Sequence, residues 1–157
     1  MTVQTSYERN IDAAFEGLLG DRNPKILVTK IVEAADGINF GRAVSRGTNK
    51  AKQVLLGAAD FVGITYRSLE REVQARGSTD IKYTDKDECG VLQNGYIWLR
   101  TTNACDAGDQ VKVNTTTGVF GSGAKGNGEV NLDGATWESK AAAGGLALLY
   151  LRSFETS

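Results

Sequence analysis

The chain has 157 residues, of which 41% are hydrophobic and 24% charged, and a net charge of -1. A chain of this length and composition can bury a core, which argues against extensive disorder. Because Lys and Arg are scattered along the chain, the sequence predicts no nucleic-acid partner, since such proteins usually carry a basic face or stripe.

The sequence contains no histidine, one proline and 19 glycines. Without histidine there is no Ser-His-Asp or Cys-His site and no imidazole metal ligand. Two isolated cysteines, Cys89 and Cys105, do not supply the roughly four ligands of a zinc site. Much of ordinary hydrolase chemistry is therefore excluded, and we expect no zinc site. The two cysteines either form a disulfide or remain reduced and buried.

The N-terminus lacks the basic start and apolar block of a signal peptide. No apolar run approaches the roughly 18 residues that cross a bilayer as a helix. We expect a soluble protein, made in the cytoplasm, with no membrane partner.

Residues 1–24 differ in pattern from the rest, and we expect them to form an N-terminal arm, either a short helix or extended, on a single β domain over residues 25–157. Apolar residues at i, i+3, i+4, i+7 spacing allow about two turns of amphipathic helix over Asn10–Leu19. Gly17 and Gly20 weaken such a helix. The arm either covers one end of its own domain or docks on a neighbouring subunit. Its candidate contact residues are Phe15, Leu18 and Leu19.

The chain becomes strand-like from Lys25, with β-branched and alternating segments separated by glycine. Predicted strands lie within residues 25–34, 37–47, 52–57 and 60–69. The second of these is expected to be one continuous strand with glycine at both ends. Residues 69–88 are charged and lack a clear period, so we expect a long exposed loop, or one that begins with a helical turn.

The dipeptide Asn94-Gly95 is the clearest hairpin signal in the sequence. Asn-Gly suits the positive φ angles of a type I′ turn, so we expect a hairpin between strands Cys89–Gln93 and Tyr96–Thr101.

The strand after this turn has two different faces. Ile97 and Leu99 lie on one face, and Tyr96, Trp98 and Arg100 lie on the other. If Ile97 and Leu99 face the core, the other three form an exposed aromatic–arginine patch, the composition of an interface centre. The reverse assignment would place Trp98 in the core. Tyr96, Trp98 and Arg100 are therefore candidate interface residues.

Two motifs in the sequence match chemical sites only in part. Gly121, Gly123 and Gly126 spell G-x-G-x-x-G, but turn signals follow where a phosphate site needs a helix, so we expect a flexible hairpin loop against which nothing packs. An acidic cluster over residues 85–88 lacks the spacing of an EF-hand and is more typical of a solvated surface.

The remaining strands are predicted within residues 109–115, 117–120, 135–139 and 144–154. Trp98 and Trp137 are each more typical of a core residue than of a sugar-binding platform. Asn127-Gly128 and Asp133-Gly134 are predicted turns. Strand-length segments recur at the roughly 8–12-residue spacing of a sandwich or barrel, and no helix signal exceeds about ten residues. We predict an all-β fold, either a compact β-barrel or a jelly-roll-like sandwich, with an N-terminal arm.

An ordered set of segments across most of the chain carries a family resemblance. The segments are "AAFEGLLGD", "VEAADGINFGRAVSRG", "ADFVGITYRS", "VLQNGYIWLRT", "AGDQVKVNTTTGVF" and "WESKAAAGGLALLYLR". In this order they resemble the capsid cement, or decoration, proteins of tailed bacteriophages.

The resemblance implies a structural virion protein without catalysis or cofactor, on the outer surface of an icosahedral head. Its partners would be the major capsid protein, whose neighbouring subunits it would clamp, and other copies of itself as a dimer or trimer. It would be made in the cytoplasm of the host. Two alternatives stay open: another virion component, such as a tail, baseplate or head-completion protein, or a small β-sandwich module that binds a ligand or is an enzyme of unknown type.

Overall fold

The computed structural model describes residues 15–20, 25–68 and 82–152, which contain strands and no helix. The predicted all-β fold is confirmed, in its barrel form. Within these ranges, nothing has the length and apolarity of a membrane-spanning helix. The strands are β1 (Ile26–Val32), β2 (Ile38–Asn39), β3 (Ala43–Arg46), β4 (Gln53–Leu56), β5 (Phe61–Thr65), β6 (Lys82–Tyr83), β7 (Glu88–Arg100), β8 (Gln110–Asn114), β9 (Phe120–Ser122), β10 (Glu129–Trp137) and β11 (Leu146–Leu151).

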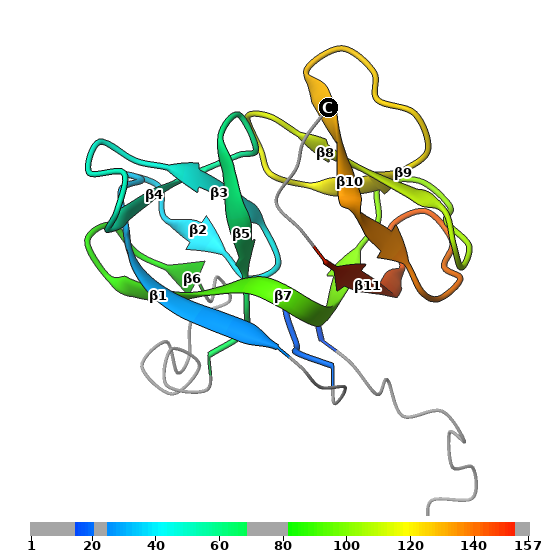
Figure 1. Ribbon diagram of the computed structural model, residues 1–157, viewed down its shortest axis with the longest axis horizontal. Helices are drawn as coiled ribbons and strands as arrows, with labels where there is room; N and C mark the ends of the chain where they lie inside the picture. The colour runs from blue at the N-terminus through cyan, green and yellow to red at the C-terminus, as the bar shows by residue number, and fades with distance from the viewer. Residues whose placement is uncertain (1–14, 21–24, 69–81, 153–157) are drawn as a thin grey trace, which may run out of the picture.

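One long sheet, ordered β1-β4-β3-β5-β7-β11-β10-β8-β9, forms two lobes that share β7 (Figure 1). In the first lobe, β1 pairs with both β4 and β7, which closes a barrel of β1, β4, β3, β5 and β7. In the second lobe, β7, β11, β10, β8 and β9 curl round until Thr101, just beyond β7, bridges Phe120 of β9. Strand β7 is therefore a wall of both lobes.

Each lobe has a packed core. The first contains buried side chains such as Val32, Val44 and Tyr83. The second is centred on Trp137 and extends into the first lobe, because it includes Phe61 from β5. Every residue of β5 is buried, since this strand lies between the two cores. The lobes are thus joined by packing as well as by β7.

The predicted hairpin at Asn94-Gly95 is wrong, because β7 runs without interruption through both residues. Gly95 has a φ of +136°. At this point β7 exchanges its pairing with β5 for pairing with β11, and its register with β1 shifts. The positive φ that would suit a turn bends a long strand from one lobe into the next.

The same correction applies to Asp133-Gly134, which lies inside β10. The register between β10 and β8 shifts between Leu132 and Thr136, where β10 begins to pair with β11. By contrast, Asn127-Gly128 is a turn, as predicted. Strand β10 begins at Glu129, earlier than the predicted strand over 135–139.

The segment 37–47 is also not one strand. It divides into β2, which pairs with β6, and β3, which pairs with β4 and β5. The chain turns between them at Gly41, whose φ is +73°. Strand β6 lies inside the predicted loop 69–88, and the helical turn considered at Leu69–Gln74 falls outside the described residues.

Candidate interaction face

The second half of β7 separates its side chains cleanly between core and surface. Ile97 and Leu99 are fully buried, whereas Tyr96 and Trp98 are partly exposed and Arg100 is exposed. The predicted alternation is therefore confirmed, with Ile97 and Leu99 facing the core. Of the two tryptophans expected in the core, Trp137 is fully buried, whereas Trp98 is partly exposed because Ile97 and Leu99 take the inward positions of its strand.

Strand β11 continues this surface. Leu146, Leu148 and Tyr150 lie opposite Arg100, Trp98 and Tyr96 in the antiparallel register, and each is partly exposed. The rings of Tyr96 and Tyr150 stack with centroids 4.3 Å apart and planes inclined by 12°. Paired aromatic side chains across strands stabilise such a surface. The outer face is defined here as Tyr96, Trp98, Arg100, Leu146, Leu148 and Tyr150.

Residues 15–20 lie along the edge of β7 next to this face, and they form a turn at Glu16-Gly17 followed by a bridge at Leu19 rather than a helix. The Gly17 amide donates to the Trp98 carbonyl at 2.8 Å, and the Trp98 amide donates to the Leu18 carbonyl at 2.9 Å. Gly20 donates to the Tyr96 carbonyl at 2.9 Å, and Leu19 forms a bridge with Ile97. The predicted helix over Asn10–Leu19 is therefore wrong for residues 15–19, and residues 10–14 lie outside the described part.

Glycine is needed at two positions where residues 15–20 pack closely against neighbouring parts of the chain. A Cβ at Gly20 would lie 2.8 Å from the Cβ of Tyr96, and one at Gly17 would lie 2.8 Å from the Cβ of Phe40. Both distances are too short for a side chain. The glycines that oppose a helix in the sequence thus allow the close approach of an added strand.

Glu16 holds the segment by charge. Its carboxylate accepts a hydrogen bond from Arg42 at 2.5 Å and lies 3.6 Å from Nε of Arg100. Glu16 and Arg42 are both mostly buried, and Arg100 also donates to the Gly144 carbonyl at 3.0 Å. One carboxylate therefore joins the segment to both lobes, an arrangement that no local sequence pattern indicates.

The three arm residues predicted as contacts lie in different environments. Leu19 packs against the second core, Leu18 is partly exposed, and Phe15 is 58% exposed. The guanidinium of Arg67 lies 4.8 Å from the centre of the Phe15 ring. Phe15 and Leu18 are therefore available on the surface beside the outer face, and Leu19 serves its own domain.

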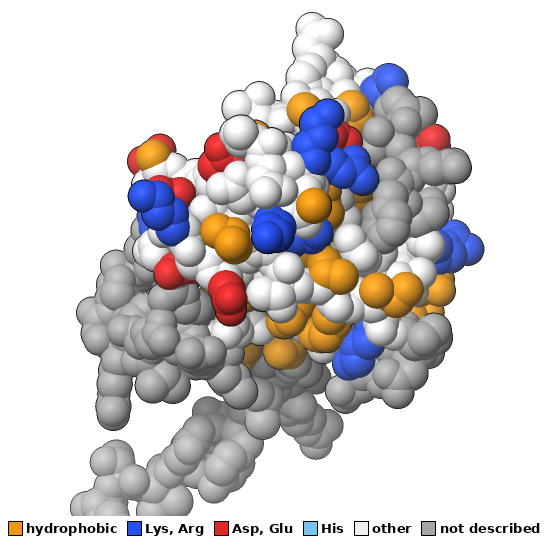
Figure 2. Space-filling model, turned by 60° about the vertical axis from the view of Figure 1, so that its left-hand side comes forward, with side chains coloured by type: hydrophobic (Ala, Val, Ile, Leu, Met, Phe, Trp, Pro, Cys, Tyr) orange, Lys and Arg blue, Asp and Glu red, His pale blue; other side chains and the backbone are white. Residues whose placement is uncertain are grey.

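Further apolar side chains are exposed on the first lobe, and sequence reasoning missed them. They are Ile26 and Leu27 on β1 and Leu55 and Leu56 on β4. Figure 2 shows apolar side chains lying among separate Lys and Arg side chains on one side of the molecule. Alternation alone did not reveal them, because adjacent residues of both strands are exposed.

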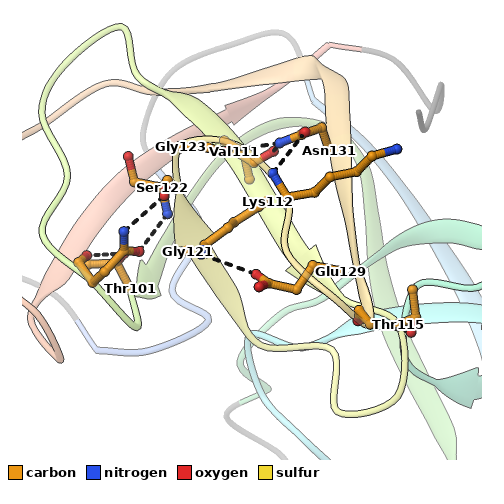
Figure 3. Close-up of polar contacts among 12 residues, drawn as sticks. Thr101, Val111, Lys112, Thr115, Gly121, Ser122, Gly123, Glu129 and Asn131 are labelled. Atoms are coloured by element: carbon orange, nitrogen blue, oxygen red, sulfur yellow. Dashed lines mark hydrogen bonds and ion pairs between the residues drawn. The ribbon is translucent and has the colours of Figure 1, made fainter.

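The G-x-G-x-x-G motif belongs to a hydrogen-bonded strand end (Figure 3). The Ser122 amide donates to Asn103 Oδ1 at 2.8 Å, and the indole of Trp137 donates to the Gly121 carbonyl at 3.1 Å. A Cβ at Gly121 would lie 2.6 Å from the hydroxyl of Thr102, so the expectation that nothing packs against this glycine is wrong. Phosphate loops present several unengaged amides, and here the Gly123 amide also donates to the Gln110 carbonyl.

The acidic residues near β7 hold turns together. Asp85 accepts a hydrogen bond from the Ala34 amide at 3.2 Å, and Asp87 accepts from the Thr84 amide at 3.0 Å. Among the residues that the structure describes, no three Asp, Glu or Cys side chains are grouped to hold a metal ion. Cys89 and Cys105 are free, buried and in different cores, so the disulfide alternative is excluded.

Comparison with known proteins gave one family match. A family model described as structural cement protein (E217 gp24/Pam3 gp6) matches residues 3–152. A search of the curated proteins found no match.

Among the solved structures that are similar to the chain, two are compared with it. One is a chain in the capsid of Myoviridae phage XM1, with a TM-score of 0.74 and 14% identity, covering 99% of this chain and 100% of that one. The other is the head fiber gp8.5 N base of bacteriophage phi29, with a TM-score of 0.48 and 11% identity, covering 84% and 98%. The first likeness shows a shared fold, and the second is too weak to support an argument.

Proposed function

Because the chain belongs to the structural cement protein family of phages, and is therefore a structural virion protein, we propose that it binds the outside of the icosahedral head and clamps neighbouring major capsid subunits. The observation that carries this proposal is the family match over residues 3–152. The protein acts in this proposal by contact alone, without catalysis, and is made in the host cytoplasm before it joins the head.

The outer face is the proposed contact surface. Tyr, Trp and Arg dominate the binding energy of many interfaces, and here Tyr96, Trp98 and Arg100 are presented on a paired strand. Tyr96 is held by stacking on Tyr150 and Arg100 by the Glu16 carboxylate, so these two side chains lose little freedom on binding. Phe15 and Leu18 extend this surface, and the part of the arm before Phe15 is proposed to reach a neighbouring subunit.

Self-association as a dimer or trimer is part of the proposal. The dimer or trimer then contacts the shell through several copies at once. Linked contacts raise the overall affinity well above the affinity of a single copy. Weak individual contacts suffice on a repeated lattice.

The first test is the molar ratio of this chain to the major capsid protein in purified particles, measured by quantitative mass spectrometry. A ratio near one, or a simple fraction of it, supports a lattice-wide cement. A few copies per particle would instead assign the protein to a tail, baseplate or head-completion structure.

The second test concerns the arm. A chain that begins at residue 15 keeps the Glu16 contacts and the Gly17 hydrogen bond, so it should fold. We expect it to bind undecorated shells more weakly than the full chain. Equal affinity would remove the arm from the proposed interface and leave the outer face as the contact.

A further inference from the structure

The turn between β9 and β10 carries a second Asn-Gly pair, and the fold treats it differently from the first. Asn127 and Gly128 are both exposed, Gly128 has a φ of +73°, and a Cβ at Gly128 would meet nothing within 4 Å. Within the described residues, neither the Asn127 side chain nor the Gly128 amide has a hydrogen-bond partner. The Asn127 side chain and the Gly128 amide are therefore open to water, while the turn is held through the Gly128 carbonyl, which accepts hydrogen bonds from the amide and the hydroxyl of Thr115 at 2.9 and 3.0 Å.

We propose that Asn127 is a site of spontaneous chemical modification, at which deamidation through a cyclic imide replaces the side-chain amide by a carboxylate. The Gly128 backbone nitrogen loses its proton and attacks Cγ of Asn127, and the Cγ–Nδ2 bond breaks with release of ammonia. Water then opens the five-membered ring at either carbonyl, which gives aspartate or isoaspartate. No oxidation or reduction takes place, and water is the only co-reactant. The missing side chain of Gly128 leaves the attacking nitrogen unobstructed.

Asn94-Gly95 has the same two residues but lies inside β7. The Asn94 side-chain amide donates to the Arg152 carbonyl at 3.1 Å, and Gly95 lies opposite Leu151 in the ladder. Ring closure requires Asn94 to leave that hydrogen bond and the backbone to leave its extended conformation. A position held on both sides by neighbouring strands resists both changes.

Asn131 supplies a second internal comparison. It is buried, its amide nitrogen donates to the carbonyls of Val111 and Gly123, and its oxygen accepts from the Lys125 amide (Figure 3). Asn131 and Asn127 lie in one tryptic peptide, 126–140, whereas Asn94 lies in peptide 87–100. Deamidation at the two Asn-Gly sites is therefore measured in separate peptides.

The position of the turn gives the modification a defined consequence. In Figure 1 the β9–β10 connection projects from the second lobe, at the opposite side from residues 15–20. A new negative charge there changes the net charge of -1 and, in the isoaspartate form, lengthens the backbone of an exposed turn. Such a change should leave the outer face and its contacts intact.

The experiment incubates the folded full chain at mildly alkaline pH and measures both peptides by mass spectrometry over time, with isoaspartate detected separately. Asn127 should convert about tenfold faster than Asn94 or more, since Asn94 must first break its hydrogen bond. In a denaturant the two sites should react at similar rates. Asn127→Gln should leave peptide 126–140 unmodified and thermal stability unchanged.

Two results would overturn the inference. One is equal conversion of Asn94 and Asn127 in the folded protein, which would mean that the fold does not discriminate. The other is an Asn127 that reacts in denaturant but stays intact in the folded chain, which would mean that the turn is protected.

Discussion

At the scale of single residues, the two tryptophans have different roles although both occupy strands. Trp137 is fully buried and donates its indole N–H to the Gly121 carbonyl, whereas Trp98 lies on the outer face opposite Leu148. The first is part of the fold, and the second is available to a partner.

Replacing each tryptophan by alanine should separate these roles. Trp98→Ala should weaken binding to shells by about 2 kcal/mol, roughly thirtyfold, as for an interface hot spot, while the protein stays folded. Trp137→Ala should destabilise the fold by about 3–5 kcal/mol through cavity formation. Urea unfolding and a shell-binding assay measure the two effects. If Trp98→Ala unfolds the protein, the outer face is structural and its proposed contact role is lost.

A second residue-scale prediction concerns alkaline pH. Burial raises the pKa of the Cys89 thiol to about 12, against 9.0 for an ordinary thiol. The unfolded chain ionises this thiol first, so the stabilisation is complete below about pH 9 and is lost as the pH rises toward about 12.

Cys89→Ala should therefore lose less stability than the original chain between about pH 8 and about pH 10. The urea midpoint at each pH measures this difference. Equal losses in both proteins would mean that the thiol does not titrate differently in the folded state.

At the scale of elements, the sequence predicted most strands from their alternation but misplaced their connections. Local dipeptide preferences cannot distinguish a turn that reverses the chain from a bend inside a long strand. At Asn94-Gly95 the strand continues because β11, from a distant part of the chain, becomes its partner, and at Asp133-Gly134 β10 continues because β11, the next strand along the chain, does the same. Which partners are present is a property of the whole fold.

The candidate surface was predictable in the same limited way. Alternation identified Tyr96, Trp98 and Arg100, because period-two patterning is local. The Glu16 contacts to Arg42 and Arg100 were not predictable, since they join residues far apart in sequence. The same holds for the pairing of residues 15–20 with the edge of β7.

The bend in β7 gives an element-scale test. Gly95 has a φ of +136°, and a Cβ there would lie 2.9 Å from the Cβ of Lys25. Gly95→Ala should cost about 2 kcal/mol or more, from backbone strain and steric overlap together. Gly108→Ala is the matched control, with a φ of +89° and open space around it, and should cost about 1 kcal/mol. Similar urea midpoints for the two variants would argue against a tight bend.

The segment 15–20 provides a second element-scale test. Glu16→Gln removes the charge that faces Arg42 and Arg100, so the amides of Gly17 and Gly20 should exchange hydrogen faster. Asp60→Asn, which breaks an exposed pair with Arg46, should leave that exchange unchanged. Unchanged exchange in Glu16→Gln would mean that backbone hydrogen bonds alone hold the segment.

At the scale of the whole molecule, two cores are connected through β5 and β7. We expect residues 25–157 to unfold as a single unit, because the second core includes Phe61 from the first lobe. In a Trp98→Phe background, Trp137 fluorescence reports the second lobe and labelling of the Cys89 thiol reports the first. The two urea midpoints should coincide, and separate midpoints would divide the chain into two domains.

The shared strand has a mechanical consequence. Two bodies connected by a loop can swing about it, but two lobes that use the same 13-residue strand as a wall cannot. A force that pulls the lobes apart is transmitted along the covalent backbone of β7, and its neighbours on both edges must shear before it can extend. The two lobes are therefore stiffly coupled, and a strain applied to one is transmitted to the other instead of being absorbed between them.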